Sequence, residues 1–154
     1  NAALSRRRLR VRVSSGSPLF IMMSSQITLI LLNLTIAGII FCHLVLTTPI
    51  IFKTLDEDSA SRFLRAIFPR YYALIFLLSI PATLILYFQD SQLSWWIGFN
   101  ISAHALFGLI GIPVTNAAKD RGWETIFSLS HGFSVYCTIV IFVLSIIQFF
   151  INFD

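Results

Sequence analysis

Charged side chains are scarce in this sequence, and long parts of it have none. Of its 154 residues, 12% are charged and 56% are hydrophobic, whereas an ordinary soluble domain carries about 25% charged residues. This scarcity argues against a soluble fold, because too little polar surface remains to face water. The net charge of +4 comes from a few short stretches, and no Arg/Lys run is interleaved with aromatic residues in a polar domain. The basicity therefore does not indicate a nucleic-acid partner.

Cysteine and the usual catalytic motifs are also rare or missing. Cys42 and Cys137 lie within apolar runs and form no Cys-x-x-Cys or Cys/His cluster, so the sequence predicts neither a disulfide framework nor a zinc site. It contains no nucleophile elbow, Walker loop or metalloprotease motif. We therefore expect a protein that is not an enzyme, with no catalytic residues and no metal ligands.

Four long stretches contain no Asp, Glu, Lys or Arg. They are residues 27–52, 71–89, 95–118 and 125–153. A helix needs about 17–25 apolar residues to cross a bilayer core, and backbone in lipid must satisfy its own hydrogen bonds. The prediction is an all-α fold, an integral membrane four-helix bundle formed by residues 22–154 within a lipid bilayer.

Lysine and arginine orient the four spans. The first and third connections hold all the basic residues after the N-terminal segment, namely Lys53, Arg62, Arg65, Arg70, Lys119 and Arg121. Because short cytoplasmic loops are enriched in Lys and Arg, we expect both of these connections to be cytoplasmic and both termini to lie outside. A bacterial inner membrane is favoured, with an organellar membrane as the alternative.

The N-terminal segment conflicts with this orientation, because residues 1–21 carry five arginines and no acid. Three interpretations stay open: sequence that is not native to the working protein, an organellar transit peptide rich in Arg and Ser, or a genuine exposed arm. In each case we expect residues 1–21 to stand outside the fold as a disordered or weakly structured segment.

The first connection also predicts local structure. Thr54 and Glu57 have the spacing of a capping box, and the apolar residues from Phe63 to Phe68 fall largely on one side of a helix. This pattern predicts a short amphipathic helix on the cytoplasmic surface that ends at Pro69.

Acidic residues in the third connection complement the arginines of the first. Asp120 or Glu124 is expected to pair with Arg62, Arg65 or Arg70. Such a pair would tie the two connections together, although an exposed ion pair stabilises little.

Polar and small residues form one stripe along each span at 100° per residue. The stripes are Asn33, His43 and Thr47; Tyr72, Ser79 and Thr83; Asn100, His104, Gly108 and Gly111; and His131, Ser134, Thr138 and Ser145. The main interpretation is that these stripes are packing faces. In the alternative, Asn33, His43, Asn100 and His104 line a route for a small solute or ion, in an oligomer joined through Gly108 and Gly111.

His43 and His104 support a second alternative. Both lie roughly 15–18 Å from the cytoplasmic ends of parallel spans at 1.5 Å per residue, so facing imidazoles would be able to ligate the iron of haem b or relay protons. The spans contain no Arg or Lys to meet haem propionates. We therefore expect no cofactor, and imidazoles that point into different helix interfaces.

Two segments at the cytoplasmic side carry recurring motifs. They read TTPIIFKTLDEDSASRFLRAIFPRYYAL, with a Phe-Pro-x-Tyr turn, and TNAAKDRGWETIFSLSHGFSV, with Asn-x-x-x-Asp-x-Gly before His-x-x-Ser-Val. These motifs resemble those of the transmembrane protein 205-like family, a four-helix membrane domain of unknown function, over residues 24 to about 150. The resemblance implies either a cytoplasmic site or a loop-packing role for Phe68, Pro69, Arg70, Tyr71, Asn116, Asp120, Gly122, His131 and Ser134.

The expected function is that of a small multi-pass membrane protein without catalysis, either a membrane module or an accessory subunit of a membrane complex. Its expected partners are other membrane subunits or further copies of the chain, and not nucleic acid. The alternatives are the oligomeric transporter and the haem b redox protein described above.

Overall fold

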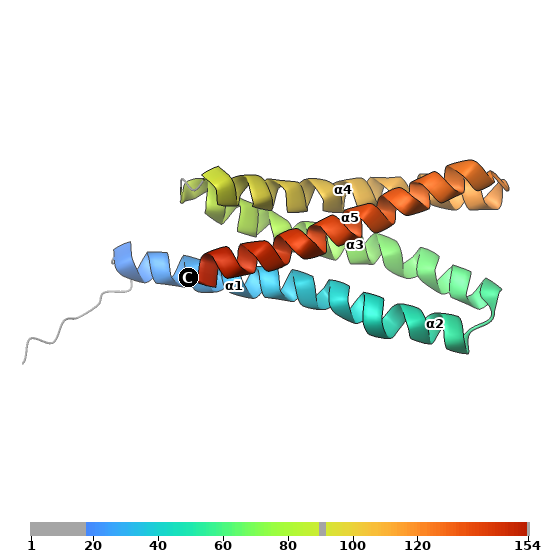
Figure 1. Ribbon diagram of the computed structural model, residues 1–154, viewed down its shortest axis with the longest axis horizontal. Helices are drawn as coiled ribbons and strands as arrows, with labels where there is room; N and C mark the ends of the chain where they lie inside the picture. The colour runs from blue at the N-terminus through green and yellow to red at the C-terminus, as the bar shows by residue number, and fades with distance from the viewer. Residues whose placement is uncertain (1–17, 90–91, 154) are drawn as a thin grey trace, which may run out of the picture.

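The computed structural model describes residues 18–89 and 92–153, and almost all of them are helical (Figure 1). The elements are α1 (Pro18–Cys42), the π-helix η1 (His43–Thr47), α2 (Thr48–Thr54), α3 (Glu57–Phe88), α4 (Gln92–Asp120) and α5 (Glu124–Phe153). Four continuous helical segments are long and apolar enough to cross a membrane, the first of them running from Phe20 through η1 to Thr54. This confirms the all-α fold and indicates a multi-pass membrane protein.

The four long helices close into a bundle. Helix α1 packs against α3 and α5, and α4 packs against the same two helices on the other side. The connections α2–α3 and α4–α5 lie at one end of the bundle, which we call the basic end, and the α3–α4 connection lies at the other (Figure 1). The two connections with basic residues therefore share one end, as the spacing of the spans predicts.

The first long helix changes its hydrogen-bonding pattern in the middle. Pro49 has no N–H to donate, and just before it the N–H of Thr48 reaches back five residues to the carbonyl of His43. The hydroxyl of Thr47 similarly bonds to the carbonyl of Cys42 at 3.4 Å. The wider π-turn lets one continuous helix accommodate the proline, and single π-turns are often found at functional sites.

Helix α3 begins and continues differently from the prediction. The carboxylate of Asp56 accepts hydrogen bonds from the N–H and the hydroxyl of Ser59, at 2.8 and 2.9 Å, and these bonds hold the pKa of Asp56 below its usual value. The capping box with Thr54 is wrong, since that hydroxyl bonds to the carbonyl of Ile50. The helix also passes through Pro69 without a break, as prolines in membrane helices are tolerated where neighbouring groups satisfy the freed carbonyls.

The N-terminal end of the first helix also differs from the prediction. Helix α1 begins at Pro18, so residues 18–21 belong to the helix and not to the separate arm that the sequence suggests. The remaining residues of that arm, 1–17, lie outside the described part of the chain.

The buried side of α4 is lined mainly by apolar residues and by residues with small side chains. It consists of Ser94, Gly98, Ile101, Ala105, Gly108, Ile112 and Ala118. Asn100 and His104 lie on a neighbouring side and are half-exposed. Of the four residues in the predicted stripe of α4, only Gly108 lies on this buried side, because small side chains and not polar ones allow the close approach of α3.

Tyr72 crosses the centre of the bundle. Its hydroxyl donates to the carbonyl of Ser134 at 2.8 Å and lies 2.7 Å from the hydroxyl of Thr138, so α3 bonds to α5 across the bundle. The ring passes beside Gly108, where a Cβ atom would come far closer to three ring carbons than van der Waals contact allows. Gly108 thus makes room for the crossing side chain.

We expect Gly108→Ala to destabilise the bundle by about 1–3 kcal/mol, because the added methyl group overpacks against the Tyr72 ring. Titration of the purified protein with SDS, followed by circular dichroism, measures the effect. Gly38→Ala is the matched control, since its Cβ would meet nothing within 4 Å. Equal stability of the two variants would contradict the crossing geometry.

Candidate functional site

The residues that the sequence singles out lie in three separate places. One group lies between α3 and α4 at the basic end, a second surrounds His43 where η1 meets α3, and a third lies on the outer side of α4 and α5. The predicted motif residues are divided between these places and the bundle interior, so they do not meet in one pocket.

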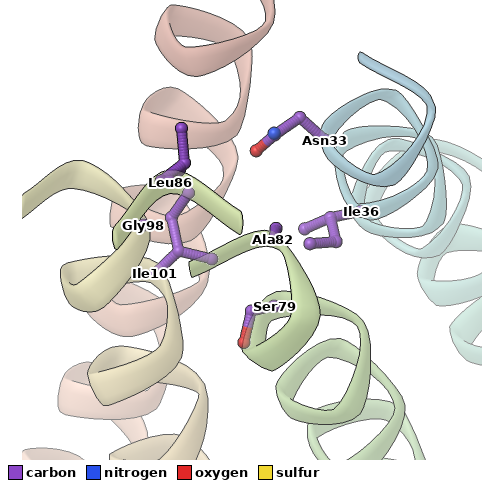
Figure 2. Close-up of a pocket in the computed structure, with 7 residues that line it drawn as sticks. All are labelled: Asn33, Ile36, Ser79, Ala82, Leu86, Gly98 and Ile101. Carbon is purple, nitrogen blue, oxygen red and sulfur yellow. The ribbon is translucent and has the colours of Figure 1, made fainter. Parts of the chain in front are cut away.

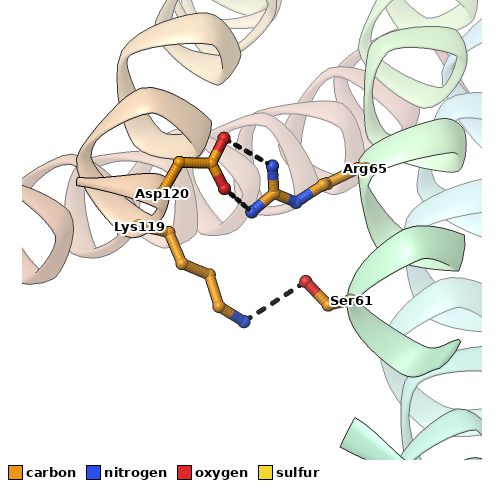
Figure 3. Close-up of polar contacts among 4 residues, drawn as sticks. All are labelled: Ser61, Arg65, Lys119 and Asp120. Atoms are coloured by element: carbon orange, nitrogen blue, oxygen red, sulfur yellow. Dashed lines mark hydrogen bonds and ion pairs between the residues drawn. The ribbon is translucent and has the colours of Figure 1, made fainter. Parts of the chain in front are cut away.

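At the basic end, four side chains join α3 to α4 (Figure 3). The guanidinium of Arg65 donates to both carboxylate oxygens of Asp120, at 2.9 and 2.5 Å. Beside this pair, the ammonium of Lys119 donates to the hydroxyl of Ser61 at 3.3 Å. We call Ser61, Arg65, Lys119 and Asp120 the charged clamp. Its bidentate pair confirms the predicted link between the two connections.

The charged clamp orients surface groups more than it stabilises the fold. The side chain of Asp120 is 58% exposed and that of Arg65 is 32% exposed, so water screens their attraction. The planar guanidinium nevertheless fixes the direction of the carboxylate, because two parallel N–H bonds allow only one relative geometry. The clamp therefore presents charges in a defined arrangement at the surface.

The turn after α4 explains one motif residue directly. Gly122 has a φ of 67°, a left-handed conformation that favours glycine. Its N–H bonds to the carbonyl of Lys119, and the N–H of Trp123 bonds to that of Ala118, which is the Schellman arrangement of a helix C-terminus. Gly122 thus ends α4 immediately after the clamp residue Asp120.

Other predicted motif residues serve local roles. The guanidinium of Arg70 donates to the carbonyl of Ala66, and the exposed ring of His131 stacks on Phe127 with centroids 5.7 Å apart. Asn116 is half-buried one helical turn before Asp120. The arrangement does not bring these three side chains together.

His43 is held in an aromatic cluster. Only 7% of the residue is exposed, and its ring lies 5.3 Å from Phe68 and 4.8 Å from Tyr71, measured between centroids. Its Nε2 atom is 3.5 Å from the hydroxyl of Thr48. The hydroxyl of Tyr71 is buried without a hydrogen-bond partner among the described residues. The Phe-Pro-x-Tyr segment of α3 therefore packs two aromatic rings around the buried histidine.

His104 lies at a different interface. Its Nδ1 atom is 2.8 Å from the carbonyl of Asn100, and its ring approaches Tyr136 of α5 with centroids 5.8 Å apart. Helices α1 and α4 do not pack against each other in the described ranges. His43 and His104 thus point into different interfaces, as expected from the sequence, and do not form a ligand pair within one chain.

Asn33 lies beside a narrow gap between α1, α3 and α4 (Figure 2). Its Nδ2 atom donates to the carbonyl of Leu29 at 2.9 Å. Across the gap, the hydroxyl of Ser102 bonds to those of Ser79 and Thr83, at 2.9 and 3.0 Å. The space is too small for a water-sized sphere, so this region joins the helices and does not form a solute path.

Two buried polar side chains on α5 lack hydrogen-bond partners in the part of the chain that the structure describes. Ser145 and Gln148 are fully buried, and neither the hydroxyl of Ser145 nor the amide of Gln148 forms a hydrogen bond among the described residues. Gln148 is not among the residues of the predicted polar stripe on α5. A signal existed, because Gln148 follows the buried residues Thr138, Ile141 and Ser145 at helical spacing.

No curated protein and no solved structure matches the chain. One family model does, over residues 31–124, which extend from the first membrane-crossing helix to the first residue of α5. The match covers the charged clamp, the His43 cluster and the outer side of α4. Because it spans more than half of the sequence, the chain belongs to the family described as a domain of unknown function, DUF4149.

Proposed function

We propose that the protein is a non-catalytic module or accessory subunit of a membrane complex, and that its charged clamp docks a partner. The observation that carries this proposal is the bidentate contact between Arg65 and Asp120, with Lys119 and Ser61 beside it. The contact stabilises little but fixes the positions of charged groups at an exposed surface. Because the contact adds little to the stability of the fold, the fixed positions of its charges are better explained by binding to a partner.

The packing of the bundle interior supports this proposal. Tyr72 bonds to α5, and the hydroxyls of Ser79, Thr83 and Ser102 bond to one another. These polar groups are therefore engaged in joining helices. The gap beside Asn33 is too narrow for water, so this gap offers no room for a solute.

The two alternative functions gain no support from a specific contact. Gly108 lies against Tyr72 inside the bundle and is unavailable to join copies in a transporter. His43 and His104 lie at different interfaces, so a haem held between them would need the helices to rearrange. We therefore propose neither transport nor haem binding.

We further propose that the basic end is cytoplasmic and that both termini lie outside. The support is the restriction of Lys and Arg among the described residues to α2, the first half of α3, and the end of α4 with the turn that follows it. A bacterial inner membrane fits this arrangement, with an organellar membrane as the alternative. The motifs around Pro69 and Gly122 support a closer relation to the transmembrane protein 205-like family.

Site-specific photocrosslinking in the living cell tests the docking proposal. A photoreactive phenylalanine analogue at Phe63, which is 42% exposed at the basic end, is expected to give a discrete crosslink to another protein. Asp120→Arg should abolish the product, because it breaks the clamp and leaves like charges in contact. The charge swap Arg65→Asp with Asp120→Arg should restore it.

The matched control carries the same analogue at Phe88, which is 81% exposed at the opposite end of α3, and should not respond to the Asp120 variant. A Phe63 product that is unaffected by Asp120→Arg would refute a role for the clamp. A lone purified monomer with turnover activity would refute the non-catalytic proposal as a whole.

Cysteine labelling tests the orientation. In a chain with Cys42→Ala and Cys137→Ala, an impermeant maleimide added to intact cells is expected to label Gln92→Cys and to spare Asp58→Cys. The two positions are exposed and lie at opposite ends of the bundle. Both should react after permeabilisation, and labelling of Asp58→Cys alone in intact cells would show the opposite orientation.

A further inference from the structure

An outward-facing polar patch lies on the side of α4 and α5. Tyr136 is 54% exposed, and the neighbouring Asn100 and His104 are half-exposed. We call these three residues the outer polar patch. His104 lies near the middle of the charge-free stretch 95–118, and Tyr136 lies at the same depth because the two rings are 5.8 Å apart. The patch therefore faces the bilayer core.

Several atoms of the outer polar patch remain without partners among the described residues, and two of them, on His104 and Tyr136, complement each other as acceptor and donor. A carbonyl oxygen can only accept, so the hydrogen bond from His104 Nδ1 to the Asn100 carbonyl places the proton of the neutral ring on Nδ1. Its Nε2 atom is then an open acceptor. The hydroxyl of Tyr136 is an open donor, since its contacts with His104 and Phe133 involve only the rings.

Lipid cannot satisfy either atom. Unpaired polar groups cost free energy in hydrocarbon, and ionisable side chains within spans almost always face protein or a water-filled cavity. The outer polar patch is thus a surface that a protein partner would cover.

We infer that the partner is a second copy of this chain, related by a two-fold axis along the membrane normal. Such an axis brings residues of equal depth together and makes each contact occur twice. The Tyr136 hydroxyl of each copy would then donate to His104 Nε2 of the other. The equal depth of this donor and acceptor is what a self-complementary face requires, and an unrelated partner would not require it.

Two glycines permit the close approach. Gly111 lies seven residues after His104, and Gly132 lies four residues before Tyr136, so each shares a helix side with the patch. A Cβ atom at either glycine would meet nothing within 4 Å. Small residues at such positions let membrane helices come close enough for side chains to bond. This inference goes beyond the proposed function and does not depend on the clamp.

Energy transfer between labelled copies of the purified full chain in liposomes tests the inference, with the protein-to-lipid ratio varied. We expect a reversible dimer. Tyr136→Phe should weaken association about tenfold or more, because it removes both symmetric hydrogen bonds. His104→Leu should have a similar effect, and the double variant should be no weaker than the weaker single one, since both changes remove the same bonds.

Tyr87→Phe is the matched control, because Tyr87 is 60% exposed on α3 and loses the same hydroxyl away from the patch. It should leave dimerisation unchanged. Circular dichroism of each variant verifies that the helices are intact. A chain that stays monomeric at every lipid ratio, or a dimer that Tyr136→Phe and His104→Leu leave unchanged, would overturn the inference.

Discussion

The arrangement of the four helices depends on the hydroxyl of Tyr72, which bonds across the bundle to α5. In water, burial of apolar side chains drives helices together, but lipid is itself apolar, so close packing and interhelical hydrogen bonds must supply the specificity. The hydrogen bond that the Tyr72 hydroxyl donates to the carbonyl of Ser134, and its contact with the hydroxyl of Thr138, do so between two helices that are not packing neighbours. Tyr72 can make that contact because Gly108 has no side chain to clash with its ring.

This crossing separates the interior of the protein from the surfaces that face partners. With Tyr72 in the centre and the hydroxyls of Ser79, Thr83 and Ser102 bonded together, the interior is occupied by groups that join helices. The charged clamp at one end and the outer polar patch on one side stand apart from this core. A small membrane protein whose interior polar groups join its helices can act through such surfaces, which agrees with the proposed role as a module of a larger assembly.

The sequence predicts features that arise from long-range physical rules. Four charge-free stretches correspond to four helices because lipid forbids unpaired backbone groups, and the link between Asp120 and an arginine follows from opposite charges in two connections at the same end. Features that depend on local hydrogen bonding were harder to predict from the sequence. The π-turn at His43 and the passage of α3 through Pro69 depend on which carbonyl finds a donor. The N-cap at Asp56 depends on which side chain accepts from the first N–H groups of the helix.

The orientation of α4 shows why polarity was a poor guide to the buried side. Asn100 satisfies its side-chain amide through the carbonyl of Trp96, one turn earlier, so it gains little by facing inward. Ala105 and Gly108 are buried in its place because they allow α3 to approach. On α4, small size is therefore a better signal of burial than polarity.

A double-mutant cycle between Tyr72 and Thr138 tests the central claim most directly. The stabilities of Tyr72→Phe, Thr138→Val and the double variant are measured by SDS titration. They are compared with a parallel cycle that uses Tyr71→Phe, whose hydroxyl has no hydrogen-bond partner within residues 18–89 and 92–153. Interhelical hydrogen bonds in membranes are worth about 0.6 kcal/mol on average, up to about 1.7. A coupling of this size for Tyr72 and none for Tyr71 is predicted, and additive effects in the Tyr72 cycle would contradict the account.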